Sequence, residues 1–198
     1  MSEKPFNLVI VGVGGQGIIT MANVLASAAV MKDHNAIVAE THGLSQRGGT
    51  VIVHVRLGEA EAPLIMEGKA DLLIALEATE ALRYVNYLAK GAPAIVDSRL
   101  IRPPLPNVEM PSLEEVYKAL GEAGIRVFKT NAVEKAEELG NPQGANMYLL
   151  GYGLAVNGYG GYVDAPSIEE TIRQKVRNPE ANIKVFRAGY EDGLKARQ

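Results

Sequence analysis

The chain contains no cysteine and no tryptophan, and only 3 of its 198 residues are histidine. Without cysteine it forms no disulfide, offers no thiol nucleophile and lacks the thiolate ligands that usually hold iron-sulfur clusters. Three scattered histidines and no cysteine predict no metal site. We therefore expect any redox metal that works with this protein to be held by another chain.

Two further features are missing, a long apolar run and a block of basic residues. No stretch approaches the roughly 20 apolar residues that span a membrane. The apolar run that follows Lys4 is broken at Gly12, which predicts a strand and not a signal peptide. The formal net charge of -3 argues against binding to the backbone of nucleic acid. We expect a cytoplasmic protein that has neither a membrane nor a nucleic acid as its partner.

The remaining composition is that of an ordinary globular protein. Hydrophobic residues make up 47% of the chain and charged residues 22%, so a packed core is expected. A chain of 198 residues can bury one good core, but it is short for a nucleotide domain plus a separate substrate domain. We predict a single domain over residues 1-198.

The beginning of the chain predicts a strand, a glycine turn, a helix and a second strand. Residues 6-11 form a β-branched apolar run that is typical of a central strand covered on both faces. Residues 18-31 are apolar or small, which predicts a helix packed tightly against a sheet, and residues 36-40 predict the second strand. This order predicts a right-handed βαβ unit.

No crossover helix follows the second strand. Polar and glycine-rich residues 41-49 stand where that helix would normally be. Residues 50-57 then alternate between apolar and mixed positions, which predicts a strand with three valines on one face. Its other face, which carries His54, is predicted to be wet or to face a partner. We interpret His54 itself as a hydrogen-bonded structural residue.

The rest of the chain predicts more strands and several helices. Residues 71-76, 94-97 and 125-128 predict strands, with a helix over residues 80-90 between the first two. Three helix starts match capping boxes, which are Ser112 with Glu115, Asn131 with Glu134, and Ser167 with Glu170. We predict an α/β fold, a Rossmann-like three-layer α/β/α sandwich with a mostly parallel sheet and a helical C-terminal part.

Glycines follow the first strand in the pattern G-x-G-x-x-G, the fingerprint of dinucleotide-binding folds. The residues of this turn that we single out are Gly12, Gly14, Gly15, Gln16 and Gly17. The amides and dipole at the start of the next helix offer an anion site. Glu40 stands where dinucleotide folds place the acid that binds a ribose hydroxyl. The alternative is that the glycines only allow close packing, and we favour that structural use.

The segment from residue 40 to residue 49 is dense in polar and glycine residues, which is typical of a binding surface. If the preceding strand is parallel, this segment leaves the carboxyl edge of the sheet, where α/β folds bind ligands or partners. The alternative is a loop whose polar groups satisfy one another. We assign no catalytic residue and favour an interface or active-site loop made of Glu40, His42, Gly43, Ser45, Gln46, Arg47, Gly48 and Gly49.

In combination, these motifs resemble a known family. Gly12-Val13-Gly14-Gly15-Gln16-Gly17 is followed in order by Glu40-Thr41-His42-Gly43, Ser45-Gln46-Arg47-Gly48-Gly49 and His54-Val55-Arg56. This order resembles the beta subunit of indolepyruvate ferredoxin oxidoreductase, a gamma-type domain of the wider 2-oxoacid ferredoxin oxidoreductases. The likeness covers most of the chain and is densest before residue 100.

The resemblance implies an enzyme subunit. Such enzymes oxidatively decarboxylate a 2-oxoacid to an acyl-coenzyme A and reduce ferredoxin. The resemblance implies that a large alpha subunit carries thiamine diphosphate, magnesium and iron-sulfur clusters, and that this chain carries no cofactor. It also implies that coenzyme A is a co-substrate and that ferredoxin is a partner through the complex. The lack of cysteine and of a Gly-Asp-Gly motif agrees with that division. The residues around the glycine turn look most like the indolepyruvate type, which implies an aryl-pyruvate substrate.

Two other functions remain open. A free-standing Rossmann-type nucleotide-binding oxidoreductase would bind NAD or FAD at the glycine turn, whereas a pure binding module would need only an anion site there. The missing second crossover helix and the lack of a separate substrate domain argue against the dehydrogenase. We favour a non-catalytic subunit that docks on the alpha subunit and helps to shape its active site.

Overall fold

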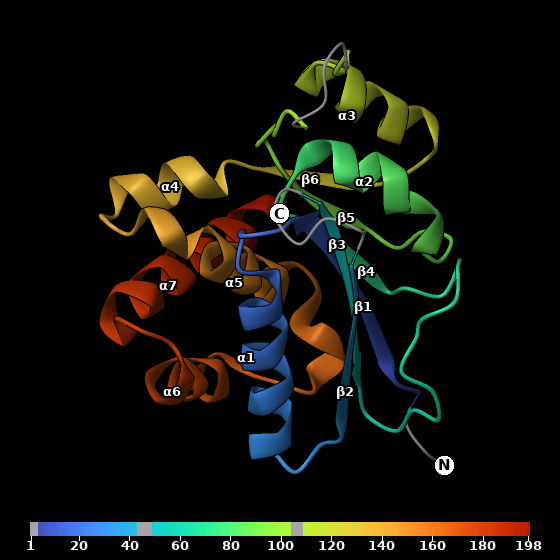
Figure 1. Ribbon diagram of the computed structural model, residues 1–198. Coiled ribbons are helices and arrows are strands. Elements are labelled where there is room, and N and C mark those ends of the chain that lie inside the picture. The colour runs from blue at the N-terminus through green and yellow to red at the C-terminus, as the bar shows by residue number, and fades with distance from the viewer. Residues whose placement is uncertain (1–3, 43–48, 104–108) are drawn as a thin grey trace.

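The structure, a computed structural model, describes residues 4–42, 49–103 and 109–198, which form one six-stranded sheet with helices on both faces (Figure 1). The strand order is β2-β3-β1-β4-β5-β6. The strands are β1 (Phe6–Val13), β2 (Ala36–His42), β3 (Thr50–Leu57), β4 (Leu72–Ala75), β5 (Ala94–Asp97) and β6 (Val127–Thr130). The helices are α1 (Ile18–Met31), α2 (Ala78–Tyr84), α3 (Leu113–Glu122), α4 (Ala132–Glu138), α5 (Ala145–Asn157), α6 (Ala165–Lys175) and α7 (Pro179–Ala196). The predicted α/β class with a mostly parallel sheet is confirmed.

Strand β3 is antiparallel to both of its neighbours, β1 and β2, whereas β1, β4, β5 and β6 are parallel to one another. An antiparallel neighbour needs no crossover helix, because the chain turns back at the same edge of the sheet. This accounts for the missing second crossover helix. It also places β3 between β1 and β2, so the predicted βαβ unit of β1, α1 and β2 encloses a third strand.

The core consists of one apolar cluster on each side of the sheet. In Figure 1, α2 and α3 cover one face, and α1 with α4 to α7 covers the other. Strand β1 is buried along its whole length, as its β-branched run predicts. Among the described residues, no helix is long and apolar enough to cross a membrane.

Helix α5 is buried on nearly every side, because α7 packs over it on the side away from the sheet. Glycines allow this close approach. A Cβ atom on Gly151 would collide with the carbonyl oxygen of Phe186, and one on Gly189 would collide with the carbonyl oxygen of Tyr148. The C-terminal helices therefore belong to the core of the fold.

The face of β3 that we predicted to be wet or to face a partner is covered by this chain itself instead. His54 is only 3% exposed. Its Nδ1 accepts a hydrogen bond from the amide of Ile65 at 3.3 Å, and the ring of Tyr87 meets its ring edge-on. Burial lowers the pKa of His54, which favours the neutral ring. The structural role of His54 is confirmed, while the expected wet face is wrong because the chain after β3 folds back over it.

The three predicted helix starts have three different outcomes in the structure. The capping box of Ser112 and Glu115 is present at the start of α3. Helix α4 begins directly after Asn131, but the Asn131 side chain makes no capping hydrogen bond. The third predicted start is wrong, because α6 begins earlier, with Asp164 as its N-cap and Ser167 in its first turn. Ser112 is the N-cap residue of its capping box, whereas Ser167 is the third residue of its helix, so the motif alone misplaces the start of α6.

Candidate functional site

The glycine turn joins the end of β1 to the start of α1, and a glutamine side chain fixes its shape. Gln16 Oε1 accepts a hydrogen bond from the amide of Val13 at 2.7 Å. Gln16 Nε2 donates to the carbonyl oxygen of Leu76, also at 2.7 Å. The oxygen thus holds the turn to the end of β1 and the nitrogen ties it to Leu76 after β4, so Gln16 stabilises the turn from both ends of its amide.

Two glycines of the turn sit in tight surroundings and a third does not. A Cβ on Gly12 would lie 2.5 Å from Gln16 Oε1. Gly17 has a φ of 75°, and a Cβ there would lie 2.5 Å from Nδ2 of Asn146, which donates to the Gly17 carbonyl at 3.0 Å. Gly15, with a φ of 99°, has nothing within 4 Å of such an atom. The geometry favours close packing for Gly12 and Gly17, and open space beside Gly15.

Part of the predicted polar loop can be placed. Glu40 is exposed on β2, and His42 is the last residue of that strand. The carbonyl of Gly49 accepts a hydrogen bond from the amide of Gly14 at 3.0 Å, which puts the end of the loop beside the glycine turn. The other residues singled out in this loop lie outside the described residues, and they are Gly43, Ser45, Gln46, Arg47 and Gly48.

A cleft of about 710 Å³ opens at the carboxyl edge of the parallel strands. We call it the edge cleft. Its floor is the glycine turn after β1, Leu76 after β4 and Asp97 at the end of β5. Open α/β sheets bind ligands at this edge. The walls of the edge cleft include Arg99, Asn141, Gln143, Asn146, Lys175, Arg177, Asn178 and Asn182.

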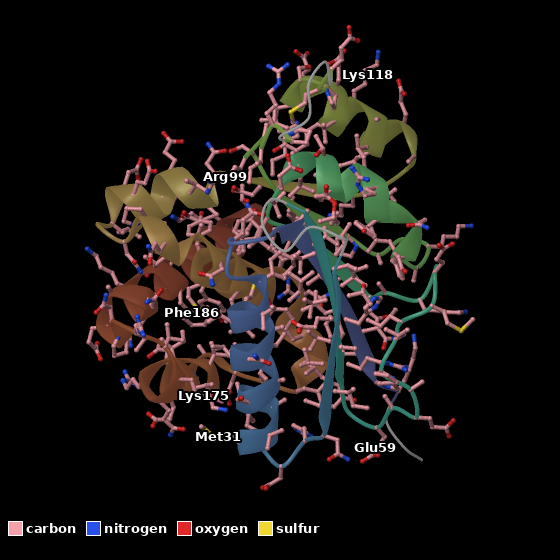
Figure 2. The ribbon with its side chains drawn as sticks, viewed as in Figure 1. Met31, Glu59, Arg99, Lys118, Lys175 and Phe186 are labelled. Atoms are coloured by element: carbon pink, nitrogen blue, oxygen red, sulfur yellow. The ribbon has the colours of Figure 1, made fainter. Side chains whose placement is uncertain are left out.

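The edge cleft is electropositive. Helices α1, α5 and α7 all begin at it, and a helix N-terminus carries partial positive charge. Lys175 Nζ donates to the hydroxyl of Ser27 at 2.8 Å. Within the described part of the chain, no carboxylate pairs with Arg99 or Arg177. Figure 2 shows Arg99 and Lys175 well apart, so these two cations line different parts of the cleft.

Two buried carboxylates hold the segment that carries Arg99. Asp97, at 1% exposure, accepts a hydrogen bond from the amide of Ala132 at 2.6 Å. Burial raises the pKa of Asp97, and the hydrogen bonds that it accepts oppose that shift. On the other side of the segment, the fully buried Glu77 accepts from the amide of Ile101 at 3.1 Å. Arg99 is therefore presented to the cleft by a rigid support.

A third acidic side chain, Glu80, lies at the same edge of the sheet, beside the first residue of β3. Its Oε1 accepts from the hydroxyl of Thr50 at 3.2 Å, and its Oε2 lies 3.4 Å from Nε of Arg83. Glu80 is 5% exposed, and burial raises the pKa of its carboxyl group. Because Thr50 is the first residue of β3, Glu80 fixes the point at which the chain enters that strand.

The sequence prediction missed most of the edge cleft. Asp97 ends a predicted buried strand, so its place at the carboxyl edge was a usable signal. Arg177 and Asn146 come from segments far along the chain, and no local pattern connects them with the glycine turn. Glu77 and Glu80 look like ordinary charged residues at a helix start, and their burial is visible only in the fold.

Comparisons with known proteins agree with this architecture. Residues 7–192 match the family model of pyruvate ferredoxin/flavodoxin oxidoreductase. The chain is 40% identical to indolepyruvate oxidoreductase subunit IorB of Archaeoglobus fulgidus, an alignment that covers 96% of each chain. It superposes on a keto/oxoacid ferredoxin oxidoreductase gamma subunit of Geobacter sulfurreducens with a TM-score of 0.72 and 25% identity, covering 98% of this chain and 99% of that one.

A further match shows the same fold inside a longer chain. The 2-oxoglutarate:ferredoxin oxidoreductase of Magnetococcus marinus, solved with 2-oxoglutarate, coenzyme A and succinyl-CoA bound, superposes with a TM-score of 0.70. The match covers 98% of this chain but 32% of that one, and the identity of 18% speaks for the fold alone. From the family model and the near full-length relatives, the chain belongs to the pyruvate ferredoxin/flavodoxin oxidoreductase family, as one subunit of a 2-oxoacid ferredoxin oxidoreductase.

Proposed function

We propose that this chain is the non-catalytic subunit of an indolepyruvate ferredoxin oxidoreductase. In this reaction an aryl-pyruvate, coenzyme A and oxidised ferredoxin give an aryl-acetyl-coenzyme A, carbon dioxide and reduced ferredoxin. The observation that carries the proposal is the 40% identity to an indolepyruvate oxidoreductase subunit over 96% of both chains. The whole chain, residues 1-198, would act as one gamma-type domain.

The catalytic cofactors belong to the large alpha subunit in this proposal. The chain has no cysteine to ligate an iron-sulfur cluster. The described residues also include no group of three or more histidine, aspartate or glutamate side chains that would hold a metal ion. In this proposal, thiamine diphosphate, magnesium and the clusters reach the reaction on the alpha subunit, and ferredoxin meets the complex there.

The segment from His42 to Gly49 is proposed to dock on the alpha subunit near its active site. The hydrogen bond between the Gly14 amide and the Gly49 carbonyl supports this, because it holds the end of the segment at the carboxyl edge beside the edge cleft. An arginine such as Arg47 suits a carboxylate or phosphate on the other side of that interface.

The edge cleft is proposed to take part in binding coenzyme A. Its volume of about 710 Å³, the unpaired arginines within the described residues and the three helix N-termini suit a large ligand with several phosphate charges. The Gly15 side of the glycine turn is open toward this space. This use gives the turn an anion-binding role without making it a dinucleotide site.

The geometry disfavours the free-standing dinucleotide-binding enzyme. In such folds the acidic residue ends a strand next to β1. Here β3 lies between β1 and β2, so Glu40 is two strand spacings from β1, about 9.6 Å. The side chain of Gln16 also occupies the turn with two structural hydrogen bonds.

Co-expression with the large alpha subunit tests the proposal. We expect the chain purified alone to be colourless and inactive. With the alpha subunit it should co-purify as a brown complex that reduces ferredoxin or a viologen dye when given indolepyruvate and coenzyme A. Activity of the isolated chain, or tight NAD or FAD binding in a calorimetric titration, would favour the alternative oxidoreductase.

A further inference from the structure

We infer that the open edge of β2 is a pairing site for an extended strand of the large alpha subunit. The inference rests on the proposed function, because it takes the alpha subunit as the partner. It adds a defined surface, a pairing mode and the residues whose backbone groups would form the pairs. Among the described residues, β2 is the last strand on its side of the sheet, so one row of its backbone groups has no neighbouring strand there.

The hydrogen bonds of β3 show which groups face outward. The Gly58 amide donates to the Asn35 carbonyl, and the Gly14 amide donates to the Gly49 carbonyl. Residues of an antiparallel strand bond alternately to one side and the other. With the observed register, Ile37 and Ala39 bond to β3, and the amides and carbonyls of Ala36, Val38 and Glu40 point away from the sheet. Among the described residues, none donates to or accepts from those outward groups.

The two edges of the sheet are built differently. The opposite edge strand, β6, has only 4 residues and carries the exposed Lys129, a common device against unwanted pairing. Strand β2 has 7 residues, Ala-Ile-Val-Ala-Glu-Thr-His, with no proline, lysine or arginine. An unguarded edge of this length is the kind that accepts an added strand from another chain.

The kind of partner follows from what this edge offers. The outward groups of one 7-residue strand supply too few backbone hydrogen bonds to hold two copies of the chain together without further contact area. The alpha subunit would supply that area, because β2 ends at His42, where the proposed docking segment begins. The only clearly charged side chain of β2 is the exposed Glu40, so the added strand is expected to place a lysine or arginine beside it.

Amide hydrogen exchange on the unmodified chain provides the first test. In the isolated chain, the amides of Val38 and Glu40 should exchange fast, while those of Ile37 and Ala39 are protected by β3. In the active complex, exchange at Val38 and Glu40 should slow by roughly tenfold or more. If the complex is active and these two amides still exchange fast, the edge proposal is wrong and the proposed function stands. If they are already slow in the isolated chain and speed up on dilution, the occupant is a second copy, and the proposal is overturned.

Proline substitution provides the second test. Val38→Pro removes an outward amide and no bond to β3, so the chain should still fold but bind the alpha subunit at least roughly tenfold more weakly. The matched control is Lys129→Pro. The Ala94 and Ser98 amides donate to the Arg126 and Thr130 carbonyls, so the Lys129 amide faces outward from the opposite edge. Equal binding by the two variants would overturn the proposal.

Discussion

Replacing Gly17 by alanine should destabilise the protein for two reasons that can be separated. The first is backbone strain, since a φ of 75° costs a residue with a Cβ about 1–2 kcal/mol. The second is a collision with Asn146, whose Nδ2 donates to Gly17 and whose Oδ1 accepts from the Met147 amide. Losing these two hydrogen bonds costs about 0.5–1.5 kcal/mol each. The free energy of unfolding should therefore fall by about 2–5 kcal/mol.

Gly124 provides the control for strain alone. Its φ is 74°, and nothing lies within 4 Å of a Cβ placed there. Gly124→Ala should cost only the strain of about 1–2 kcal/mol. Urea unfolding followed by circular dichroism, with no nucleotide present, measures both losses. If Gly17→Ala is no more costly than Gly124→Ala, the packing argument for the glycine turn is refuted.

A double substitution isolates the contact itself. Asn146→Ala removes the side chain with which the new methyl group would collide. The Gly17→Ala/Asn146→Ala protein should then be more stable than the sum of the single losses predicts, by about 1 kcal/mol. Strict additivity would mean that the two residues do not interact in the way that the structure shows.

Two further predictions concern the edge cleft and α6. Arg99→Ala should change the free energy of unfolding by no more than about 0.5 kcal/mol. In steady-state assays of the complex, Arg99→Ala should raise the KM for coenzyme A roughly tenfold and leave the KM for indolepyruvate unchanged. The surface control Lys118→Ala should change neither KM. A normal KM for coenzyme A in the Arg99→Ala complex would exclude Arg99 from the site. Asp164 caps α6 and contacts Lys32, which lowers the pKa of its carboxyl group to about 2. Asp164→Ala should cost about 1 kcal/mol at pH 7. Because the folded-state pKa lies below the unfolded value of about 3.9, the charge-dependent part of this loss is present above about pH 3.9 and disappears as the pH falls to about 2. The assignment would be contradicted if the urea midpoints of the wild-type and Asp164→Ala proteins differed equally at pH 7 and pH 2.

Local patterns in the sequence predicted the elements whose character is set by their own residues. The apolar run of β1 predicted that strand, and the small apolar residues of α1 predicted that helix. Ser112 with Glu115 marked the start of α3. The last strand lies at Val127–Thr130, later than the predicted residues 125-128, because a short apolar run does not show where pairing with β5 begins.

Features that depend on distant parts of the chain could not be predicted in this way. The alternation in β3 revealed its two faces, but not that it runs antiparallel or that the chain after it covers His54. The same holds for the edge cleft. The glycine turn was found from its motif, whereas Arg177 and Asn146 join it only because α5 and α7 begin at the same edge.

The close contact between α5 and α7 has a consequence for the synthesis of the protein. Of the described elements, α7 is the last to leave the ribosome, and its glycines meet the backbone of α5, which precedes it in the chain. Until α7 emerges, no other described element covers the side of α5 that α7 packs against, so the nascent protein exposes an apolar surface suited to chaperones. Stalled or shortened translation products should therefore be handled as unfolded proteins, even though every strand of the sheet has already been made.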